Sequence, residues 1–173
     1  MCKLQELFVR YLVHYRNIDI MRSVKSFLLL LTVLWASAPS FAQMTEDPTS
    51  WKYKVKKKSA TEYQLIFHTT VKAGWHIWSV HPGGDGSLIA PSFTFAKNSK
   101  VKLKGEVTEK GKPTTTTMDG IDGKVTYLNG AIEYIQNVTV TGSTKITGTQ
   151  TYQVCSDRMC LAPKDKDFSF DIK

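Results

Sequence analysis

Hydrophobic and polar residues alternate in short runs after residue 43. From Tyr63 to Val71, every second residue is apolar or a threonine, which is typical of a strand with one buried face. Comparable runs predict further strands at 51–55, 93–95, 101–103, 125–128, 131–140, 145–155 and 168–172. Because no segment after residue 43 keeps a helical period, the pattern predicts an all-β fold.

Turn signals separate these runs. They lie at Ala73-Gly74, Pro82–Gly86, Asn98, Asn129-Gly130 and Thr141-Gly142. The Asn129-Gly130 pair is the strongest, since a type I′ turn needs positive φ at both central residues, and it predicts a tight hairpin there. About seven to nine short strands with turns roughly every ten residues predict an immunoglobulin-like β-sandwich.

The N-terminal region has the pattern of a secretory signal. Basic residues at 21–25 precede an almost wholly apolar segment at 27–35 and a small-x-small cleavage motif ending at Ala42. Residues 1–20 lie upstream of a second Met, and we interpret them as a mis-called start or as an extended signal region. We therefore predict a signal region at 1–42 and one exported domain at 43–173. After cleavage it should not span a membrane, because no apolar segment approaches about 20 residues.

The net charge of +8 is partly concentrated in the lysine-rich run 52–58. Lysines alternate there with aromatic and β-branched residues, which favours a first strand with a solvated face over a patch for nucleic acid or anionic lipid. We therefore expect no nucleic-acid partner.

The most informative chemistry is a pair of cysteines near the C-terminus. Cys155 and Cys160 are the only cysteines after residue 43, with four residues between them. Strand patterns on both sides place them in a β-hairpin, where facing Cα atoms lie about 4.5 to 5.5 Å apart, within the range that a disulfide tolerates. The hairpin can therefore close a disulfide with little backbone movement.

Strand parity predicts the environment of Cys155. Tyr152 and Val154 share the apolar parity, which leaves Cys155 on the polar face. Such a short loop differs from the inter-sheet disulfide of an immunoglobulin domain and stabilises by only about 2 kcal/mol. Spacing alone leaves two hypotheses open, a redox centre and a local structural disulfide.

A resemblance to a known family favours the redox centre. The segment Tyr152–Pro163, preceded by the aromatic segment Gly74–Ser79 and by Pro91–Phe95, resembles the N-terminal periplasmic domain of the thiol:disulfide interchange protein DsbD. The similarity covers essentially all of 43–173. It implies an immunoglobulin-like domain in the periplasm whose cysteine pair accepts electrons from a thioredoxin-like module. The electrons then pass to periplasmic partners in disulfide isomerisation or cytochrome c maturation.

The resemblance also assigns roles to residues. It makes Cys155 and Cys160 the redox pair, with Cys160 as the sulfur that forms mixed disulfides. It places His76 and Trp78 beside that site. The segment 118–123 takes the position of a cap loop that shields the cysteines, with Asp119 as a site-lining residue of the cap and Ile121 where family members have an aromatic residue.

Two departures from the family matter for function. The hairpin has one residue fewer between its cysteines than the best-known members, so it is tighter. Residues 1–173 also contain neither the membrane module nor the Cys-x-x-Cys thioredoxin-like module, so we expect that the domain either takes electrons from a separate protein or has lost its redox role. Arg158 and Lys164 lie close in sequence to Cys160, and cations of this kind lower a thiol pKa.

We therefore predict a thiol:disulfide exchange domain that acts as an electron relay more than as a free-standing catalyst, without a cofactor. The alternative is a non-catalytic secreted β-sandwich that binds another protein and uses Cys155–Cys160 structurally. A copper or zinc site built from His68, His76 and His81 with a methionine, Met118 or Met159, is a weaker hypothesis, and we expect no metal.

Export can be tested directly. Because the cleavage motif ends at Ala42, mass spectrometry of the exported protein should find Gln43, free or cyclised, at its N-terminus. Recovery of the uncleaved chain from the cytoplasm would contradict both the signal and the oxidising compartment that the redox hypothesis requires.

Overall fold

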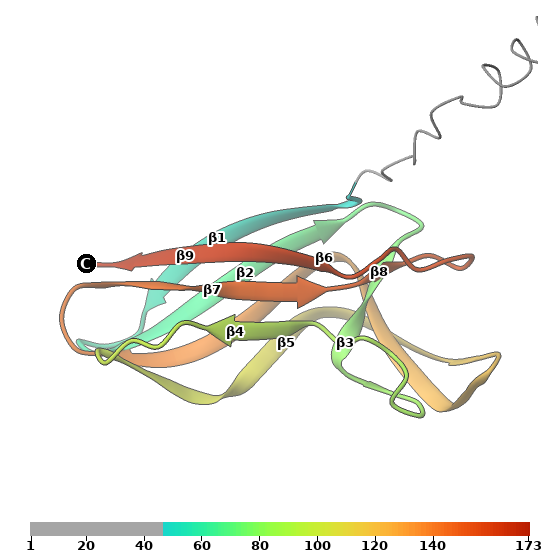
Figure 1. The fold of residues 1–173 in the computed structure, drawn as a ribbon, viewed down its shortest axis with the longest axis horizontal. Helices are drawn as coiled ribbons and strands as arrows, with labels where there is room; N and C mark the ends of the chain where they lie inside the picture. The colour runs from blue at the N-terminus through green and yellow to red at the C-terminus, as the bar shows by residue number, and fades with distance from the viewer. Residues whose placement is uncertain (1–46) are drawn as a thin grey trace, which may run out of the picture. The chain divides into compact units, whose positions relative to one another are not determined.

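The structure, a computed structural model, describes residues 47–173, so the predicted signal region at 1–42 lies outside the described residues. Within 47–173 the chain forms nine strands in two antiparallel sheets (Figure 1). No helix in this part of the chain is long and apolar enough to cross a membrane. The prediction of an all-β, immunoglobulin-like sandwich is confirmed.

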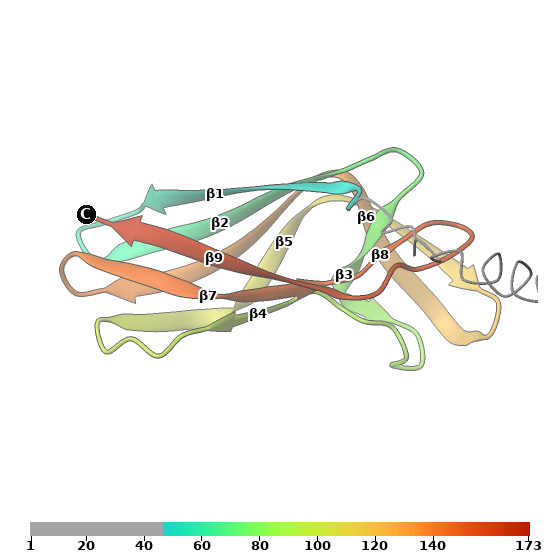
Figure 2. The same cartoon turned by 45° about the horizontal axis from the view of Figure 1, so that its top comes forward.

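The first sheet has the order β1-β2-β6-β3-β8, with β5 paired to β6, and the second has the order β4-β7-β9. Figure 2 shows β4, β7 and β9 as a layer in front of the first sheet. The bounds of the strands are β1 Thr49–Lys57, β2 Glu62–Val71, β3 His76–Gly83, β4 Ser92–Phe95, β5 Val101–Met118, β6 Ile121–Val140, β7 Thr144–Tyr152, β8 Val154–Cys155 and β9 Lys164–Ile172.

The main core lies between the sheets and is rich in aromatic rings. Phe67 of β2 is fully buried, and its ring centroid lies 4.8 Å from that of Phe168 and 5.0 Å from that of Phe170, both on β9. Edge-to-face contacts of this kind add to the free energy gained by burying apolar area. The predicted alternation in β2 is confirmed, since its residues 63, 65, 67, 69 and 71 are all buried.

The start of the domain is fastened to the end of β7. The Asp47 carboxylate accepts hydrogen bonds from the Tyr152 hydroxyl at 2.5 Å and from the Thr49 amide at 3.0 Å. Burial opposes ionisation, but these hydrogen bonds and the nearby Lys164 hold the pKa of Asp47 below its usual value. This contact fixes the strand end that leads into the cysteine hairpin.

The predicted hairpin at Asn129-Gly130 is wrong, because β6 runs without a break from Ile121 to Val140. Only Gly130 has a positive φ, of 65°, whereas a type I′ turn needs two such residues. At this point β6 changes partner from β3, which pairs with Leu128, to β2, which pairs with Ala131. The glycine therefore serves a bulge inside a long strand.

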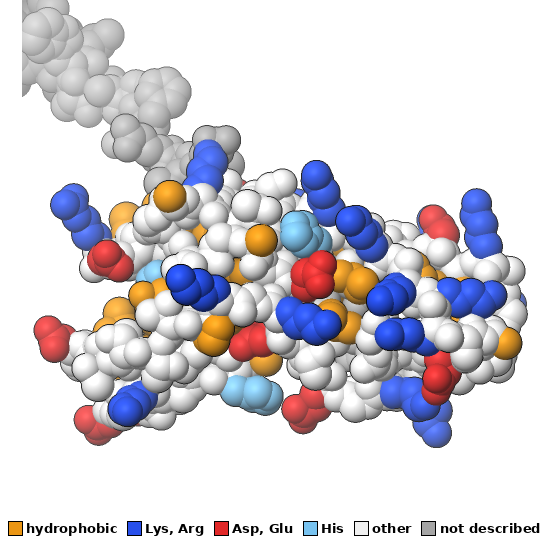
Figure 3. Space-filling view, turned by 180° about the vertical axis from the view of Figure 1, so that it is seen from behind, with side chains coloured by type: hydrophobic (Ala, Val, Ile, Leu, Met, Phe, Trp, Pro, Cys, Tyr) orange, Lys and Arg blue, Asp and Glu red, His pale blue; other side chains and the backbone are white. Residues whose placement is uncertain are grey.

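The predicted solvated face of β1 is confirmed, because Lys52, Lys54 and Lys56 are exposed. Figure 3 shows Lys and Arg side chains interspersed with Asp and Glu over the face seen from behind. Among the charged side chains of the domain, Lys104 and Glu62 form an ion pair, with Nζ and Oε1 2.6 Å apart.

Candidate functional site

Strand β3 forms the floor of the site, and the sequence pattern does not reveal it. Its first four residues, His76 to Ser79, are all buried, so the alternation that marks a half-exposed strand is missing. Both faces of β3 are covered. Ile77 belongs to the main core between the sheets, whereas Trp78 belongs to a second, smaller cluster with Val125 and Cys155.

A bulge in β3 is held by a carboxylate on β5. The pairing of β3 with β6 shifts between Trp78 and Gly83, which frees backbone groups from the ladder. Glu109 accepts hydrogen bonds from the Ser79 hydroxyl at 2.5 Å and from the Val80 amide at 2.9 Å. These bonds fix the strand immediately after Trp78.

The chain changes sheets immediately before the cysteine hairpin. Strand β7 ends at Tyr152 in the second sheet, and β8 begins at Val154 in the first sheet, with Gln153 between them. In β8, Val154 pairs with Ile77 and Cys155 pairs with His76. Directly paired residues project to the same face of a sheet, so Cys155 shares a face with His76 and Trp78.

Cys155 and Cys160 form a disulfide, and their Cα atoms are 4.0 Å apart. The two residues pair as an isolated antiparallel bridge. The Ser156 amide donates to the Met159 carbonyl at 2.8 Å, and the Leu161 amide donates to the Val154 carbonyl at 2.9 Å. The predicted hairpin is confirmed.

The two cysteines differ in exposure. Cys155 has an exposed fraction of 0% and packs against Trp78 and Val125, whereas Cys160 is exposed. The predicted parity is correct, because Val154 faces the main core and Cys155 faces the other way. The prediction of a polar face is wrong, because parity identifies the face of a strand but not what covers it.

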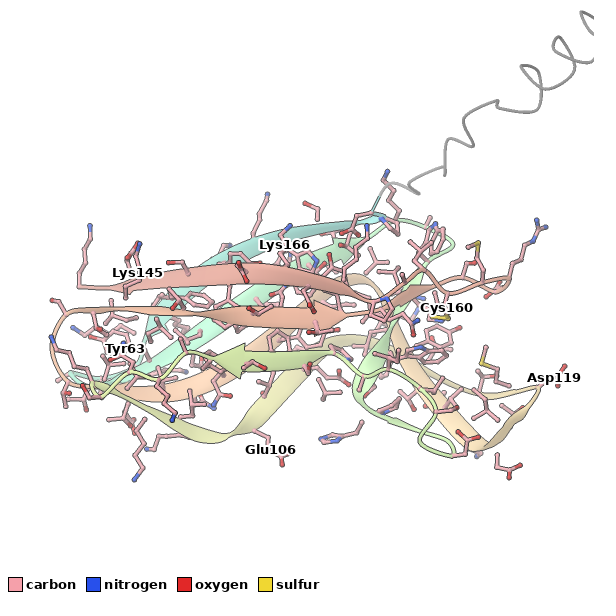
Figure 4. All side chains as sticks on the ribbon, in the orientation of Figure 1. Tyr63, Glu106, Asp119, Lys145, Cys160 and Lys166 are labelled. Atoms are coloured by element: carbon pink, nitrogen blue, oxygen red, sulfur yellow. A yellow bond between two sulfur atoms is a disulfide. The ribbon has the colours of Figure 1, made fainter. Side chains whose placement is uncertain are left out.

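The cover comes from the β5–β6 hairpin and the loop after β3. Ile121, the first residue of β6, and Leu88 pack against the cluster that contains Cys155. A Cβ atom on Gly84 would lie 2.9 Å from Ile121 Cγ2, so this contact leaves no room for a side chain on Gly84. Asp119 is exposed, and Figure 4 shows it at the tip of the hairpin, away from Cys160.

His76 is the polar residue closest in register to Cys155. Its ring stacks on Tyr127 with centroids 4.2 Å apart and meets Trp78 edge-on at 5.0 Å. Burial lowers the pKa of His76, and the nearby Asp157 carboxylate opposes this shift without reversing it. The imidazole is therefore neutral at pH 7.

Two cations were predicted to assist Cys160, and the structure places them in different surroundings. Lys164 lies 3.7 Å from Asp47, in the network at the end of β7. Arg158 is exposed in the disulfide loop, where its amide donates to the Ser156 hydroxyl at 3.3 Å. Asp157 of the same loop borders a groove of about 510 Å³ together with Trp75, His76 and Tyr127.

The three histidines of residues 47–173 do not come together in one cluster. His68 on β2 lies 3.7 Å from Glu133, His81 on β3 lies 4.0 Å from Glu106, and His76 is stacked on Tyr127. Over residues 47–173, no group of three or more His, Cys, Asp and Glu side chains could hold a metal ion.

Three residues that line the site were not predicted, namely Leu88, Val125 and Tyr127. A signal for two of them exists, because Val125 and Tyr127 alternate within a predicted strand. Without β3 as a neighbour, however, the pattern does not show that this face contacts the cysteines.

The cover makes a prediction about access to Cys155. In the reduced protein, Ile121→Ala should speed alkylation of Cys155, because the substitution removes apolar contacts that hold the cover closed. Each buried CH₂ group stabilises the closed state by about 0.8 kcal/mol, so its loss raises the open fraction roughly fourfold. Mass spectrometry can follow each cysteine separately. Ile89→Ala, at an exposed residue of the nearby loop, is the matched control. Equal rates in wild type and Ile121→Ala would mean that Ile121 does not restrict access.

Comparisons with known proteins place this chain in a family. The family described as the N-terminal part of thiol:disulfide interchange protein DsbD matches residues 42–172. No curated protein matches the chain.

Two solved structures resemble the fold. The N-terminal periplasmic domain of ScsB from Proteus mirabilis has a TM-score of 0.56 at 16% identity, covering 73% of this chain, which spans only 47% of that one. The reduced DsbD N-terminal domain of Neisseria meningitidis has a TM-score of 0.47 at 11% identity, covering 70% of this chain and 84% of that one. Since the family match covers most of the sequence, the chain belongs to the DsbD N-terminal family of thiol:disulfide exchange domains.

Proposed function

We propose that Cys155–Cys160 is the redox centre of an exported electron relay. The relay takes electrons from a thioredoxin-like donor and passes them to periplasmic acceptors of disulfide isomerisation or cytochrome c maturation. The observation that carries this proposal is the unequal exposure of the two bonded cysteines, since Cys155 is fully buried and Cys160 is exposed. An exchange partner approaching from solvent meets Cys160.

Unequal exposure assigns the roles in exchange. A donor thiolate attacks Cys160 Sγ, the Cys155–Cys160 bond breaks, and Cys155 leaves as a thiolate that takes up a proton. The second thiol of the donor then resolves the mixed disulfide, which leaves the donor oxidised and both cysteines reduced. In the next step the Cys160 thiolate attacks an acceptor disulfide, and Cys155 resolves the mixed species as the acceptor is reduced.

The location of the pair also favours a reversible bond. Cys155 belongs to the small outer cluster with Trp78 and Val125, whereas the bulk of the apolar core lies on the other side of the first sheet. Opening the disulfide therefore leaves the contacts between the two sheets in place. The ScsB domain of similar fold is periplasmic, and the predicted signal region supports the same compartment for this chain.

Cysteine variants test the roles directly. Removal of a resolving cysteine traps a mixed disulfide, whereas removal of the attacked cysteine prevents it. Cys155→Ser should therefore accumulate a covalent complex with a thioredoxin-like partner on a non-reducing gel, and Cys160→Ser should not. The opposite pattern would reverse the assignment, and no complex from either variant would favour a structural disulfide.

Stability gives an independent test. The short loop stabilises by only about 2 kcal/mol in the chain-entropy description, and the main core does not include the cysteines. Cys155→Ser combined with Cys160→Ser should remain folded at 25 °C, with unfolding in urea shifted by roughly that amount. An unfolded double variant would support the structural hypothesis instead.

A further inference from the structure

Two polar atoms beside Cys155 lack hydrogen-bond partners. Nε2 of His76 and the indole Nε1 of Trp78 are both buried, and neither has a partner while the disulfide is closed. Buried polar groups in folded proteins are nearly always paired. The two atoms also differ in kind, since a neutral imidazole nitrogen can accept and an indole N–H can only donate.

Both side chains lie on the same face of the sheet as Cys155. His76 pairs directly with Cys155 across β3 and β8, so the two side chains project from the same face of the sheet. Trp78, two residues further along β3, packs against Cys155 in the outer cluster. The rings of His76 and Trp78 meet edge-on at 5.0 Å, without a hydrogen bond between them.

With the His76 proton on Nδ1, Nε2 is an acceptor, and a disulfide sulfur cannot satisfy it because it has no proton to donate. A thiol can do so, since S–H donates and sulfur also accepts weakly. We propose that His76 and Trp78 form a binding site for the reduced Cys155 thiol, which donates to His76 Nε2 and accepts from Trp78 Nε1. The disulfide and the dithiol then differ in the number of satisfied buried groups, and the difference favours the dithiol.

The chemistry balances with a dithiol as the reductant. The donor supplies two electrons and two protons, its two sulfurs become bonded to each other, and the Cys155–Cys160 bond breaks. One proton goes to Cys160 and the other to Cys155 Sγ, which then donates it in a hydrogen bond to His76 Nε2. The ring itself gains no proton and acts as an acceptor.

The charges around His76 are compatible with this role. Tyr127 of β6 stacks on the ring, and the adjoining groove is bordered by Asp157 of the disulfide loop and Lys72 of the turn before β3. Burial keeps the pKa of His76 below its usual value despite Asp157. The neutral form, the only one with an acceptor nitrogen, is therefore present at pH 7.

The test compares redox equilibria. Wild type and variants are equilibrated with mixtures of reduced and oxidised dithiothreitol at pH 7, and the reduced fraction is read from alkylation on a gel. His76→Phe keeps an aromatic ring but removes the acceptor, so the equilibrium constant for reduction should fall about 3- to 10-fold, where tenfold corresponds to about 30 mV for two electrons.

Two further variants separate hydrogen bonding from packing. His76→Gln restores an acceptor oxygen near the position of Nε2 and should recover most of the wild-type constant. His81→Phe makes the same change on the same strand at a side chain that is 79% exposed, and it should leave the constant unchanged. An unchanged constant in His76→Phe, or an equal fall in His76→Gln, would overturn the proposal.

An NMR readout tests the other half of the site. The indole N–H resonance of Trp78 should move downfield on reduction of the wild type, because it gains an acceptor. The same resonance in Cys155→Ala should not respond to reductant, and an unresponsive wild-type resonance would also overturn the proposal.

This inference rests on the proposed function only in taking the disulfide to be reducible, and the same titration distinguishes the two. The difference between wild type and His76→Phe tests the thiol site. The absolute potential of the wild type tests the relay, because structural disulfides lie below about −300 mV and redox-active ones lie above it.

Discussion

The arrangement of the site depends on the change of sheet at Gln153. Tyr152 is the last residue paired in the second sheet, and Val154 is the first paired in the first sheet. A strand that continued beside β9 would have left Cys155 in the second sheet. Because β8 instead pairs with β3, Cys155 is brought to the face that carries Trp78, and the chain leaves that face again at the exposed Cys160.

The first sheet therefore supports two separate apolar clusters, one on each face. Alternate residues of β3 and β8 serve different clusters, with Ile77 and Val154 directed to the main core and Trp78 and Cys155 to the outer one. The outer cluster has only three buried residues, so the position of its strands depends also on polar contacts. The Glu109 carboxylate supplies part of that support by holding the bulge that follows Trp78.

Sequence reasoning succeeds here where a signal is local. The alternation of β2 identifies a strand, and the spacing of Cys155 and Cys160 identifies a closed hairpin. Sequence reasoning fails where pairing with distant strands determines the local structure. Strand β3 is buried on both faces and shows no alternation, and the turn signal at Asn129-Gly130 is overridden because β6 continues between β5 and two successive partners.

The same limit applies to the site residues. The family resemblance brings His76, Trp78 and Ile121 near the cysteines, and the structure places all three around the buried sulfur. The structure does not bring Asp119 or Lys164 to that sulfur. Asp119 lies at an exposed hairpin tip, and Lys164 contacts Asp47. Long polar side chains near a loop in sequence can turn to several partners, and only the folded arrangement selects among them.

The small number of cysteines has a consequence for how the domain matures. Cys155 and Cys160 are the only cysteines of residues 47–173, so only one disulfide can form within this part of the chain. The loop between them is short enough to close in an unfolded chain. Oxidation before folding and oxidation after folding thus give the same bond within the domain, without disulfide reshuffling.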